Sequence, residues 1–521
     1  MIFPPDGHGP YRLLRALGGA PVARFHESLA QPEAAQRDRL SVILRGAHGT
    51  AFARAAGLLG TEGLTEFRST VPISDHAAHR PWLDRVEAGE ANVLTRERVL
   101  QLVQTSGTTG GPKRLPVTPT WARSVADAQR LWVLGLLRDD EALAGGAALS
   151  IVSPAVSGHT AGGLAFGSNT GRMFQAQPFW VRWRAPVPYE AYAIPDVSLR
   201  QYTILRQALA ADVRSWTAAN PSTILLYTRR LHEWWEELRR DLADGTLQRT
   251  GARGLPRRTL GDAPAWPWNL RRLNCWTGGP ARFFVDRLPG ALGREIPVRE
   301  VGITASEGYF AVPVDDGDPV AWLGGHLLEF IDEDGAAHWA WEVEVGRIYR
   351  LVVSTEAGLY RYDLGDLVQI TGFVGRAPRM VFLRRAGAEL SAVGERVTEA
   401  QLQAALRDTV PEASAIAATI AWAEVPSLRI AIGVTSELDT DIFDTFDRVL
   451  AGHNLEYADR RATGRYAAPQ IVRLDPSAWE RWKAVRVAAG APEAQVKDPV
   501  VLAEAAFAEL VALGRPYSHS V

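Results

Sequence analysis

The feature that most constrains the fold is the run TSGTTGGPK at residues 105–113, which directly follows the apolar run VLQLVQ at residues 99–104. Glycine loses the most backbone entropy on ordering, and serine and threonine compete for backbone hydrogen bonds, so the first run predicts a loop. VLQLVQ predicts a strand. The loop then lies at a strand-to-loop junction, the usual place of phosphate recognition in α/β folds. Its N–H groups, hydroxyls and terminal lysine are suited to hold an anion.

Spacing separates this loop from other glycine-rich loops of known chemistry. A Walker A loop needs Ser or Thr after Gly-Lys, whereas Arg114 follows Lys113 here. The glycines within 105–113 do not fit the GxGxxG spacing of a dinucleotide site. The nearest approach to the GxSxG turn of a serine hydrolase is TASEG at 304–308, where threonine replaces the first glycine. Taken alone, the loop is also compatible with a solvated linker.

The composition predicts a globular protein and restricts the classes of partner. Of the 521 residues, 46% are hydrophobic and 22% are charged, and the formal net charge is -2. This charge gives no reason to expect a nucleic acid or an acidic membrane surface as a partner. The single cysteine, Cys275, excludes an internal disulfide framework and a cysteine zinc site. Such cysteine usage fits a reducing cytoplasm, where we expect the protein to reside.

The sequence shows neither a secretion signal at its start nor a membrane span. The start, MIFPPDGHGPYRLL, has no basic region followed by an apolar region, so it does not resemble a secretion signal. The most membrane-like stretch, residues 142–168, is interrupted by Pro154, His159 and several glycines. We therefore expect buried strands and tight turns there, and no membrane partner.

The pattern of apolar residues predicts helices in the first half of the chain and strands later. Helical spacing is found over 22–60, over 196–218 and over 220–243, and a long amphipathic helix is predicted after the loop. Beyond Gly278, short β-type runs are bounded by glycine, aspartate and proline. This order of elements is typical of an α/β domain in which helices flank β-sheets.

A second pattern begins near residue 385. Two strands are expected in 415–434, one helix over 441–464, another strand in 468–475 and a final helix from 477. The sequence thus predicts an α/β protein with a large N-terminal domain at 1–384 and a small, mobile C-terminal α+β domain at 385–521. The expected hinge lies at Arg384 and Arg385.

Further segments follow the loop in a fixed order: VGITASEGYF at 301–310, GLYRYDLGDLVQITGF at 358–373, LSAVGERVTE at 390–399 and GAPEAQVKDP at 490–499. With these motifs the sequence resembles the adenylate-forming superfamily. More narrowly, it resembles the Gretchen Hagen family of acyl-acid amido synthetases, as a bacterial-type member. The resemblance extends over nearly the whole chain, through WTGGPARFFVDRL at 276–288, APRMVFLRR at 377–385 and RRATGRYAAPQ at 460–470.

The resemblance implies an ATP site with Mg²⁺ in the first domain. Its phosphate-binding loop comprises Ser106, Gly107, Thr108, Thr109, Gly110 and Lys113. Thr304, Ala305 and Ser306 are expected to line the nucleotide, and Glu307 to hold the Mg²⁺, a cation that prefers oxygen ligands. A simpler interpretation of this segment is a surface turn with an exposed glutamate.

The motif YRYDLGD at 360–366 offers two carboxylates. Asp366 follows the glycine and so matches the family's nucleotide-binding aspartate, which can accept hydrogen bonds from both ribose hydroxyls. Asp363 is expected to be solvated or structural, and Arg361 to be an ordinary strand arginine.

Two catalytic residues are implied in the C-terminal domain. The family has Asp-Lys or Glu-Lys where this chain has Glu395-Arg396; Arg396 keeps the charge but cannot give up its proton. Lys497 matches the late lysine that meets the α-phosphate, where it would stabilise charge that develops in the transition state. Arg385 matches the family's hinge position, and its simpler interpretation is a salt bridge at the domain boundary.

The resemblance implies a ligase that forms a carbon–nitrogen bond. A carboxylic acid would be activated by ATP as an acyl-adenylate with release of pyrophosphate, and the acyl group would pass to an amine or amino acid with release of AMP. Two alternatives remain open: an acyl-CoA ligase and a catalytically silent nucleotide-binding regulator, toward which Arg396 in place of lysine points. No carrier-protein segment is recognisable, Cys275 offers no grounds for a thioester, and the sequence predicts no oligomeric state.

Overall fold

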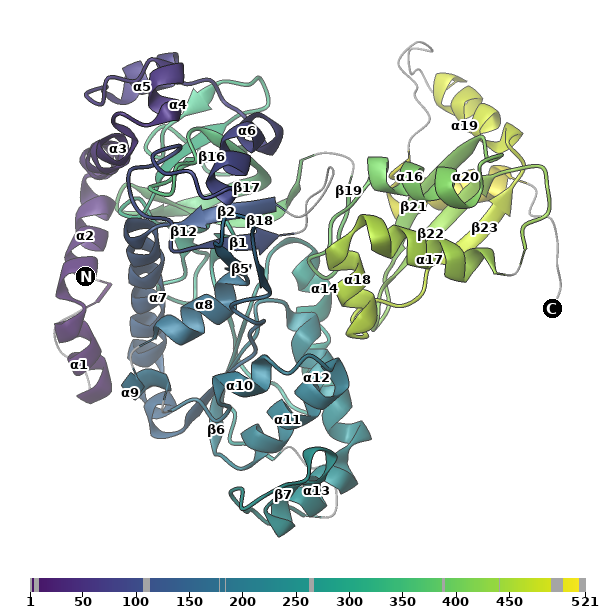
Figure 1. Ribbon diagram of the computed structural model, residues 1–521, viewed down its shortest axis with the longest axis horizontal. Coiled ribbons are helices and arrows are strands. Elements are labelled where there is room, and N and C mark those ends of the chain that lie inside the picture. The colour runs from purple at the N-terminus through teal and green to yellow at the C-terminus, as the bar shows by residue number, and fades with distance from the viewer. Residues whose placement is uncertain are drawn as a thin grey trace. The chain divides into compact units, whose positions relative to one another are not determined.

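The computed structural model describes residues 2–3, 9–105, 113–177, 179–182, 184–261, 267–386, 389–439, 441–488 and 500–514. Of the residues predicted to form the site, Ser106, Gly107, Thr108, Thr109, Gly110 and Lys497 lie outside these ranges. The chain divides into two compact units (Figure 1): the first comprises Met1–Gln104 and Arg114–Ala386, and the second comprises Thr105–Lys113 and Gly387–Val521. Each unit is described by itself.

Helices open the first unit, as the apolar spacing over 22–60 predicts. They are α1 (Gly9–Leu17), α2 (Gly19–Ala30), α3 (Pro32–Ala47), α4 (Ala51–Ala56), α5 (Leu64–Thr70) and α6 (His76–Glu87). Their buried residues join one large hydrophobic core with the strands that follow. Among the described residues, no helix combines the length and the apolar character that crossing a bilayer requires.

A four-stranded sheet carries both ends of the glycine-rich loop. Its strands are β1 (Gln101–Thr105), β2 (Lys113–Val117), β4 (Gly158–His159) and β5 (Ala165–Gly167), in the order β2-β1-β5-β4. The strand predicted from VLQLVQ is therefore confirmed. The long helix α7 (Pro119–Asp139) follows β2. It begins there because the Thr118 hydroxyl accepts the backbone N–H of Trp121 and Pro119 occupies the first turn.

A second four-stranded sheet is wholly parallel. It comprises β3 (Ala147–Ser150), β6 (Val213–Thr217), β9 (Arg272–Cys275) and β10 (Val298–Glu300), in the order β10-β9-β6-β3. The carboxyl ends of its strands therefore lie at one edge of the sheet. The helix predicted over 196–218 is wrong in its last part, because α11 ends at Leu209 and β6 is paired with strands on both sides. The stretch 142–168 does form short strands and turns, but they are only partly buried.

Shorter elements connect the strands of this sheet. They are η1 (Glu141–Gly145), α8 (Asn169–Ala176), α9 (Phe179–Arg182), α10 (Tyr189–Tyr192), α11 (Val197–Leu209), α12 (Pro221–Glu233), α13 (Trp235–Asp244), β7 (Thr246–Leu247), η2 (Gln248–Thr250), β8 (Ala252–Arg253), η3 (Gly279–Ala281), α14 (Arg282–Val285) and α15 (Leu288–Leu292). The single helix predicted over 220–243 is two helices, α12 and α13, which meet at Trp234.

An eight-stranded antiparallel sheet completes the first unit. It comprises β11 (Ile303–Ala305), β12 (Gly308–Val312), β13 (Val320–Ala321), β14 (Leu327–Ile331), β15 (Ala337–His338), β16 (Ile348–Ser354), β17 (Tyr362–Val374) and β18 (Ala377–Arg385). These are the strands expected beyond Gly278. Helix α7 packs against β12, and this contact places the residues that follow β2 beside the TASEG motif.

The second unit is α+β. Its elements are β19 (Glu389–Leu390), β20 (Val397–Thr398), α16 (Glu399–Thr409), β21 (Ala415–Ala421), β22 (Ser427–Gly433), α17 (Ile442–His453), α18 (Leu455–Ala462), β23 (Gln470–Leu474), α19 (Ser477–Ala488) and α20 (Glu504–Leu513). The single helix expected over 441–464 is two helices, because the Asn454 side chain accepts the N–H of Tyr457 and starts α18. Strands β22 and β23 are parallel, so the chain between them completes a βαβ unit.

Candidate functional site

The glycine-rich loop is held between two neighbouring strands. β1 ends at Thr105 and β2 begins at Lys113, whose side chain is half-buried. Four residues after β2 ends, α7 contributes Trp121, which is buried. The segment after the loop is thus anchored to the hydrophobic core by the Trp121 side chain.

The TASEG motif forms a tight hairpin beside α7. Ala305 of β11 pairs with Gly308 of β12, so Ser306 and Glu307 form the turn between the strands. The Trp121 indole N–H donates to the Glu307 carbonyl oxygen at 2.8 Å, and the Glu307 side chain is buried at 6% exposure. Thr304, Ala305 and Ser306 are half-buried. The simpler interpretation, an exposed glutamate on a surface turn, is therefore wrong.

A buried histidine requires glycine at the end of this turn. A Cβ atom on Gly308 would lie 2.6 Å from Nε2 of His326, so no larger residue fits. Nδ1 of His326 lies 2.9 Å from a carboxylate oxygen of Glu356, which is itself buried. The His326–Glu356 pair therefore packs against the hairpin at Gly308.

A glutamate that the sequence did not single out connects two motifs. Glu300 ends β10, and one of its oxygens accepts the N–H and the hydroxyl of Thr277 at 2.6 and 2.7 Å. Its other oxygen accepts the N–H groups of Val301 and Gly302 at 2.9 and 3.0 Å. Burial raises the pKa of the Glu300 carboxyl. The available signal was its place at the carboxyl end of a parallel strand, directly before the VGITASEG motif.

Asp366 lies in β17 opposite the end of β18. Gly365 has a φ of 71°, which side-chain-bearing residues rarely adopt, and this turn of the backbone precedes Asp366. Nε of Arg385 donates to Oδ1 of Asp366 at 2.9 Å, and Asp366 is 7% exposed. Within the described ranges, Oδ2 of Asp366 receives no hydrogen bond from the protein. One edge of the carboxylate is therefore available to a ligand.

The other residues of YRYDLGD have structural roles. Asp363 accepts the N–H of Gly365 at 2.8 Å and lies 3.1 Å from Arg350, as expected for a structural carboxylate. Arg361 is not an ordinary strand arginine. It is buried, has a φ of 44° and forms an ion pair with Glu329 at 2.9 Å. Its guanidinium also donates to the carbonyl oxygens of Arg68 and Val71.

In the second unit, Glu395 and Arg396 differ in exposure. Glu395 is fully buried, and its two oxygens accept the N–H groups of Ala392 and Val393, each at 2.7 Å. Burial raises the pKa of Glu395 to about 7. Arg396 is half-buried, and its carbonyl oxygen accepts the side-chain N–H of Asn454. Glu395 thus shapes the turn that presents Arg396.

Three other reactive side chains, His159, His326 and Cys275, lie apart from these motifs or are buried. His159 is exposed in β4, whereas His326 is occupied by Glu356. Cys275 is buried as predicted, and burial raises the pKa of its thiol. In the part of the chain that the structure describes, no three His, Cys, Asp or Glu side chains gather in a way that could hold a metal ion.

The first unit brings several predicted segments together. Thr277 joins Glu300, and a Cβ on Gly278 would lie 2.7 Å from the carbonyl oxygen of Phe382 in β18. The WTGGP loop therefore contacts both the VGITASEG segment and the strand that carries Arg385. Arg396 belongs to the second unit, and Lys497 and the centre of the loop lie outside the described residues.

Comparison with known families gives three matches along the chain. The GH3 family N-terminal domain matches residues 21–254, the GH3 family central domain matches 320–385, and the GH3 family C-terminal domain matches 402–506. Together these models cover most of the sequence in the family's own order.

Individual relatives agree with this assignment. Indole-3-acetic acid-amido synthetase GH3.2 of Arabidopsis thaliana is 25% identical over 442 residues, which are 74% of this chain and 79% of the relative. Jasmonoyl--L-amino acid synthetase GH3.5 of Oryza sativa subsp. japonica is 25% identical over 431 residues, 72% of this chain and 74% of the relative.

Two solved structures share the fold. The AtGH3.15 acyl acid amido synthetase in complex with 2,4-DB superposes with a TM-score of 0.66 at 18% identity and covers 98% of both chains. 2-Hydroxyisobutyryl-CoA ligase in its thioesterification state has a TM-score of 0.58 at 17% identity, with 92% of both chains covered. The predicted α/β architecture with a small C-terminal domain is thereby confirmed. The chain belongs to the GH3 family and has its adenylate-forming fold.

Proposed function

We propose that the chain is an ATP-dependent acyl-acid amido synthetase, which joins a carboxylic acid to an amine or amino acid through an acyl-adenylate. The observation that carries the proposal is a pair of buried carboxylates, Glu307 at the hairpin turn and Asp366 in β17. Each has an oxygen that accepts no hydrogen bond from the described residues and is therefore open to a ligand. A bound metal–nucleotide supplies the missing partners.

The reaction consists of two displacements. In the first, a carboxylate oxygen of the acid attacks the α-phosphorus of ATP, the bond to pyrophosphate breaks, and an acyl-adenylate forms. In the second, the nitrogen of a neutral amine attacks the acyl carbon, AMP leaves with the bridging oxygen, and the nitrogen loses a proton. Both substrates of the first step are anions, so positioning and charge neutralisation supply most of the rate.

Residue roles follow the family motifs and stay proposals. The loop residues Ser106 to Gly110 and Lys113 bind the phosphates, Thr304, Ala305 and Ser306 line the nucleotide, and Asp366 accepts the ribose hydroxyls. Arg396 and Lys497 neutralise phosphate charge. In this scheme Arg385 positions Asp366, because its Nε donor occupies Oδ1 and leaves Oδ2 for ribose.

The residues present fit a magnesium ion that arrives with the nucleotide. Mg²⁺ keeps several waters and is bound by one or two carboxylates together with substrate phosphates, so a cage of three protein ligands is not required. Glu307 supplies one buried carboxylate with no protein donor among the described residues. When bound, the ion would neutralise phosphate charge, and Glu307 would orient it.

Amide formation is favoured over thioester formation. The similarity to 2-hydroxyisobutyryl-CoA ligase is one of fold and does not select an acyl acceptor. The sequence relatives described above are both named for amide synthesis. We propose by the same reasoning that the substrates are small acids and amino acids, with no carrier protein and no nucleic acid.

Two finer assignments complete the proposal. A bacterial-type branch of the family is supported by the modest identity of 25% to the two plant enzymes. A cytoplasmic location is supported by the single buried cysteine.

A screen of carboxylic acids by ATP–pyrophosphate exchange tests the function. We expect acid-dependent exchange, trapping of the acyl group by hydroxylamine, and no consumption of coenzyme A. Lys497→Ala should slow exchange more than it weakens ATP binding. Exchange accompanied by coenzyme A consumption would establish the acyl-CoA ligase instead. ATP binding without exchange for any acid would indicate the silent regulator.

A further inference from the structure

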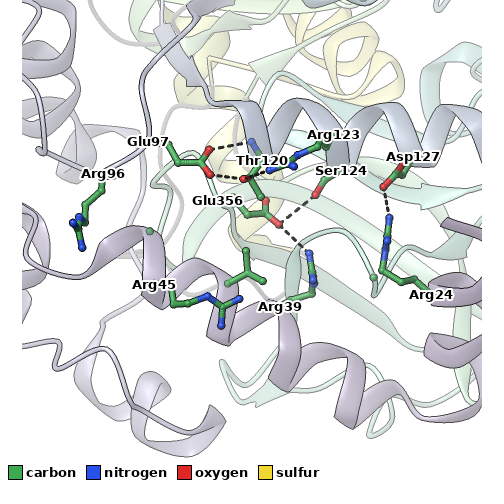
Figure 2. Close-up of a pocket in the computed structure, with 13 residues that line it drawn as sticks. Arg24, Arg39, Arg45, Arg96, Glu97, Thr120, Arg123, Ser124, Asp127 and Glu356 are labelled. Carbon is green, nitrogen blue, oxygen red and sulfur yellow. Dashed lines mark hydrogen bonds and ion pairs between the residues drawn. The ribbon is translucent and has the colours of Figure 1, made fainter. Parts of the chain in front are cut away.

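A cavity of ≈ 690 Å³ lies in the first unit between α3 and α7 (Figure 2). None of the described residues that we assign to the nucleotide lines it. Side chains reach it from α2, α3, the segment after α6, α7 and the turn before β17. Five of the lining residues are arginines: Arg24, Arg39, Arg45, Arg96 and Arg123. We call it the arginine cavity.

Two of the five arginines have an acidic partner in the cavity wall. Arg24 forms an ion pair with Asp127, and Arg39 lies 3.8 Å from Glu356 at the base. Because these pairs are already neutral in sum, they add little net field. The field of the cavity then comes from the other three arginines and from Glu97.

Within the described part of the chain, no ion pair is formed by Arg45, Arg96 or Arg123, although the charge of Arg123 acts on Asp127. The remaining wall carboxylate, Glu97, is directed at α7, where it accepts the N–H of Thr120 at 3.0 Å. Among the described residues, Arg123 donates to the Thr120 hydroxyl at 2.9 Å. Figure 2 shows arginines entering from both sides, with Arg39 and Arg45 on α3 and Arg123 on α7. The lining therefore carries an excess of positive charge, with five arginines against three carboxylates, and Arg45, Arg96 and Arg123 are exposed to solvent.

We propose that the arginine cavity binds a small polyanion that carries phosphate groups. Guanidinium groups present planar N–H pairs that match phosphate oxygens, and three of them on separate elements suit a ligand with more than one phosphate. The hydroxyls of Thr120 and Ser124 offer further partners.

The lining also limits the shape of the ligand. Among the described lining residues, only Val42 has an apolar side chain, and none has an aromatic ring that could stack on a base. The volume lies within the range typical of small-molecule sites. A sugar bisphosphate or inorganic pyrophosphate fits these requirements, whereas a ligand that must bury a nucleobase does not.

Calorimetric titration of the full-length protein tests the proposal with two probes. Fructose 1,6-bisphosphate has no carboxylate to be activated and no nucleobase, and pyrophosphate represents an inorganic source. We expect saturable binding that the double variant Arg45→Gln/Arg96→Gln weakens at least about tenfold. The matched control, Arg37→Gln/Arg98→Gln, removes the same charge from the same helix and the same connecting segment. It should change the affinity less than about twofold.

Each result decides the matter. Tighter binding of the sugar bisphosphate points to a metabolite and tighter binding of pyrophosphate to an inorganic ligand. Because the nucleotide site also binds pyrophosphate, either result supports the arginine cavity when Arg45→Gln/Arg96→Gln weakens that binding. Equal affinity of the two double variants would overturn it, as would the absence of heat with both probes. Citrate binding as tight as either phosphate would overturn the phosphate class. Arg45, Arg96, Arg37 and Arg98 are all exposed, so the variants should melt like the parent protein.

Discussion

Asp366 in the first unit and Glu395 in the second are both nearly inaccessible, with 7% and 0% exposure, yet their oxygens have different partners. Asp366 is bound on one oxygen by a guanidinium group and offers the other. Glu395 gives both oxygens to backbone N–H groups of its own turn. Burial alone therefore does not mark a functional carboxylate. The acceptor that the protein leaves unused is the better indicator.

The largest effect is expected for Asp366→Asn. The amide keeps an oxygen for Arg385 but presents an NH₂ group where ribose hydroxyls need an acceptor, so exchange should fall at least about 100-fold. Melting temperature should stay unchanged. Asp363→Asn is the matched control, because its carboxylate lies on the same strand and pairs with Arg350. Equal losses of exchange in Asp366→Asn and Asp363→Asn would show that the unused oxygen of Asp366 has no special role.

Glu395→Gln should affect stability rather than catalysis. A glutamine can accept only one of the two N–H groups and turns its own NH₂ toward the other, so the free energy of unfolding should fall by about 1–3 kcal/mol. Chemical denaturation measures this loss. Exchange at a temperature far below melting should stay within about threefold of the parent. Glu399→Gln, four residues further on, provides a half-buried control. A collapse of exchange in folded Glu395→Gln would assign this carboxylate to the chemistry.

The pH dependence of stability sharpens the contrast. The pKa of folded Glu395 is raised to about 7, above that of the unfolded chain, so between roughly pH 4.5 and 7 the folded protein keeps a proton that the unfolded chain releases. The contribution of Glu395 to stability therefore falls as pH rises through this window. We expect the parent protein to gain about 2 kcal/mol relative to Glu395→Gln between pH 8 and pH 5. A constant difference would show that the carboxylate stays ionised throughout.

Arg396→Lys should have the smallest effect. The turn that Glu395 holds is unchanged, and lysine keeps the positive charge at a half-buried position. Exchange should stay within about threefold of the parent, because a phosphate contact depends more on the positive charge than on the paired N–H groups of a guanidinium. A gain of more than tenfold would mean that arginine impairs this enzyme, which is the expectation for the silent regulator.

The architecture was largely predictable from the sequence, and its misassignments have local causes. The strands beyond Gly278 have clear β-type runs, so they were found. β6 was assigned to a helix because Val213–Thr217 continues an amphipathic pattern, and only its parallel neighbours β3 and β9 fix it as a strand. The break at Asn454 depends on one side-chain cap within a continuous helical pattern.

The site was predictable where it rests on motifs and unpredictable where it rests on packing. Asp366 and Glu307 were identified by position, but the burial of Glu307 under Trp121 follows from a contact between residues 186 apart. The structural role of Arg361 could not be predicted for the same reason, since the carbonyl oxygens of Arg68 and Val71 that it binds are remote in sequence. The arginines of the arginine cavity are scattered from α2 to α7, so no local pattern groups them.

The central claim is that a carboxylate oxygen of the acid attacks the α-phosphorus of ATP. It is tested most directly with an acid that supports exchange, labelled with ¹⁸O at both carboxylate oxygens. After turnover with an amine, mass spectrometry should find one ¹⁸O in AMP and one in the amide. Label in inorganic phosphate with formation of ADP, or unlabelled AMP beside the amide, would contradict the claim.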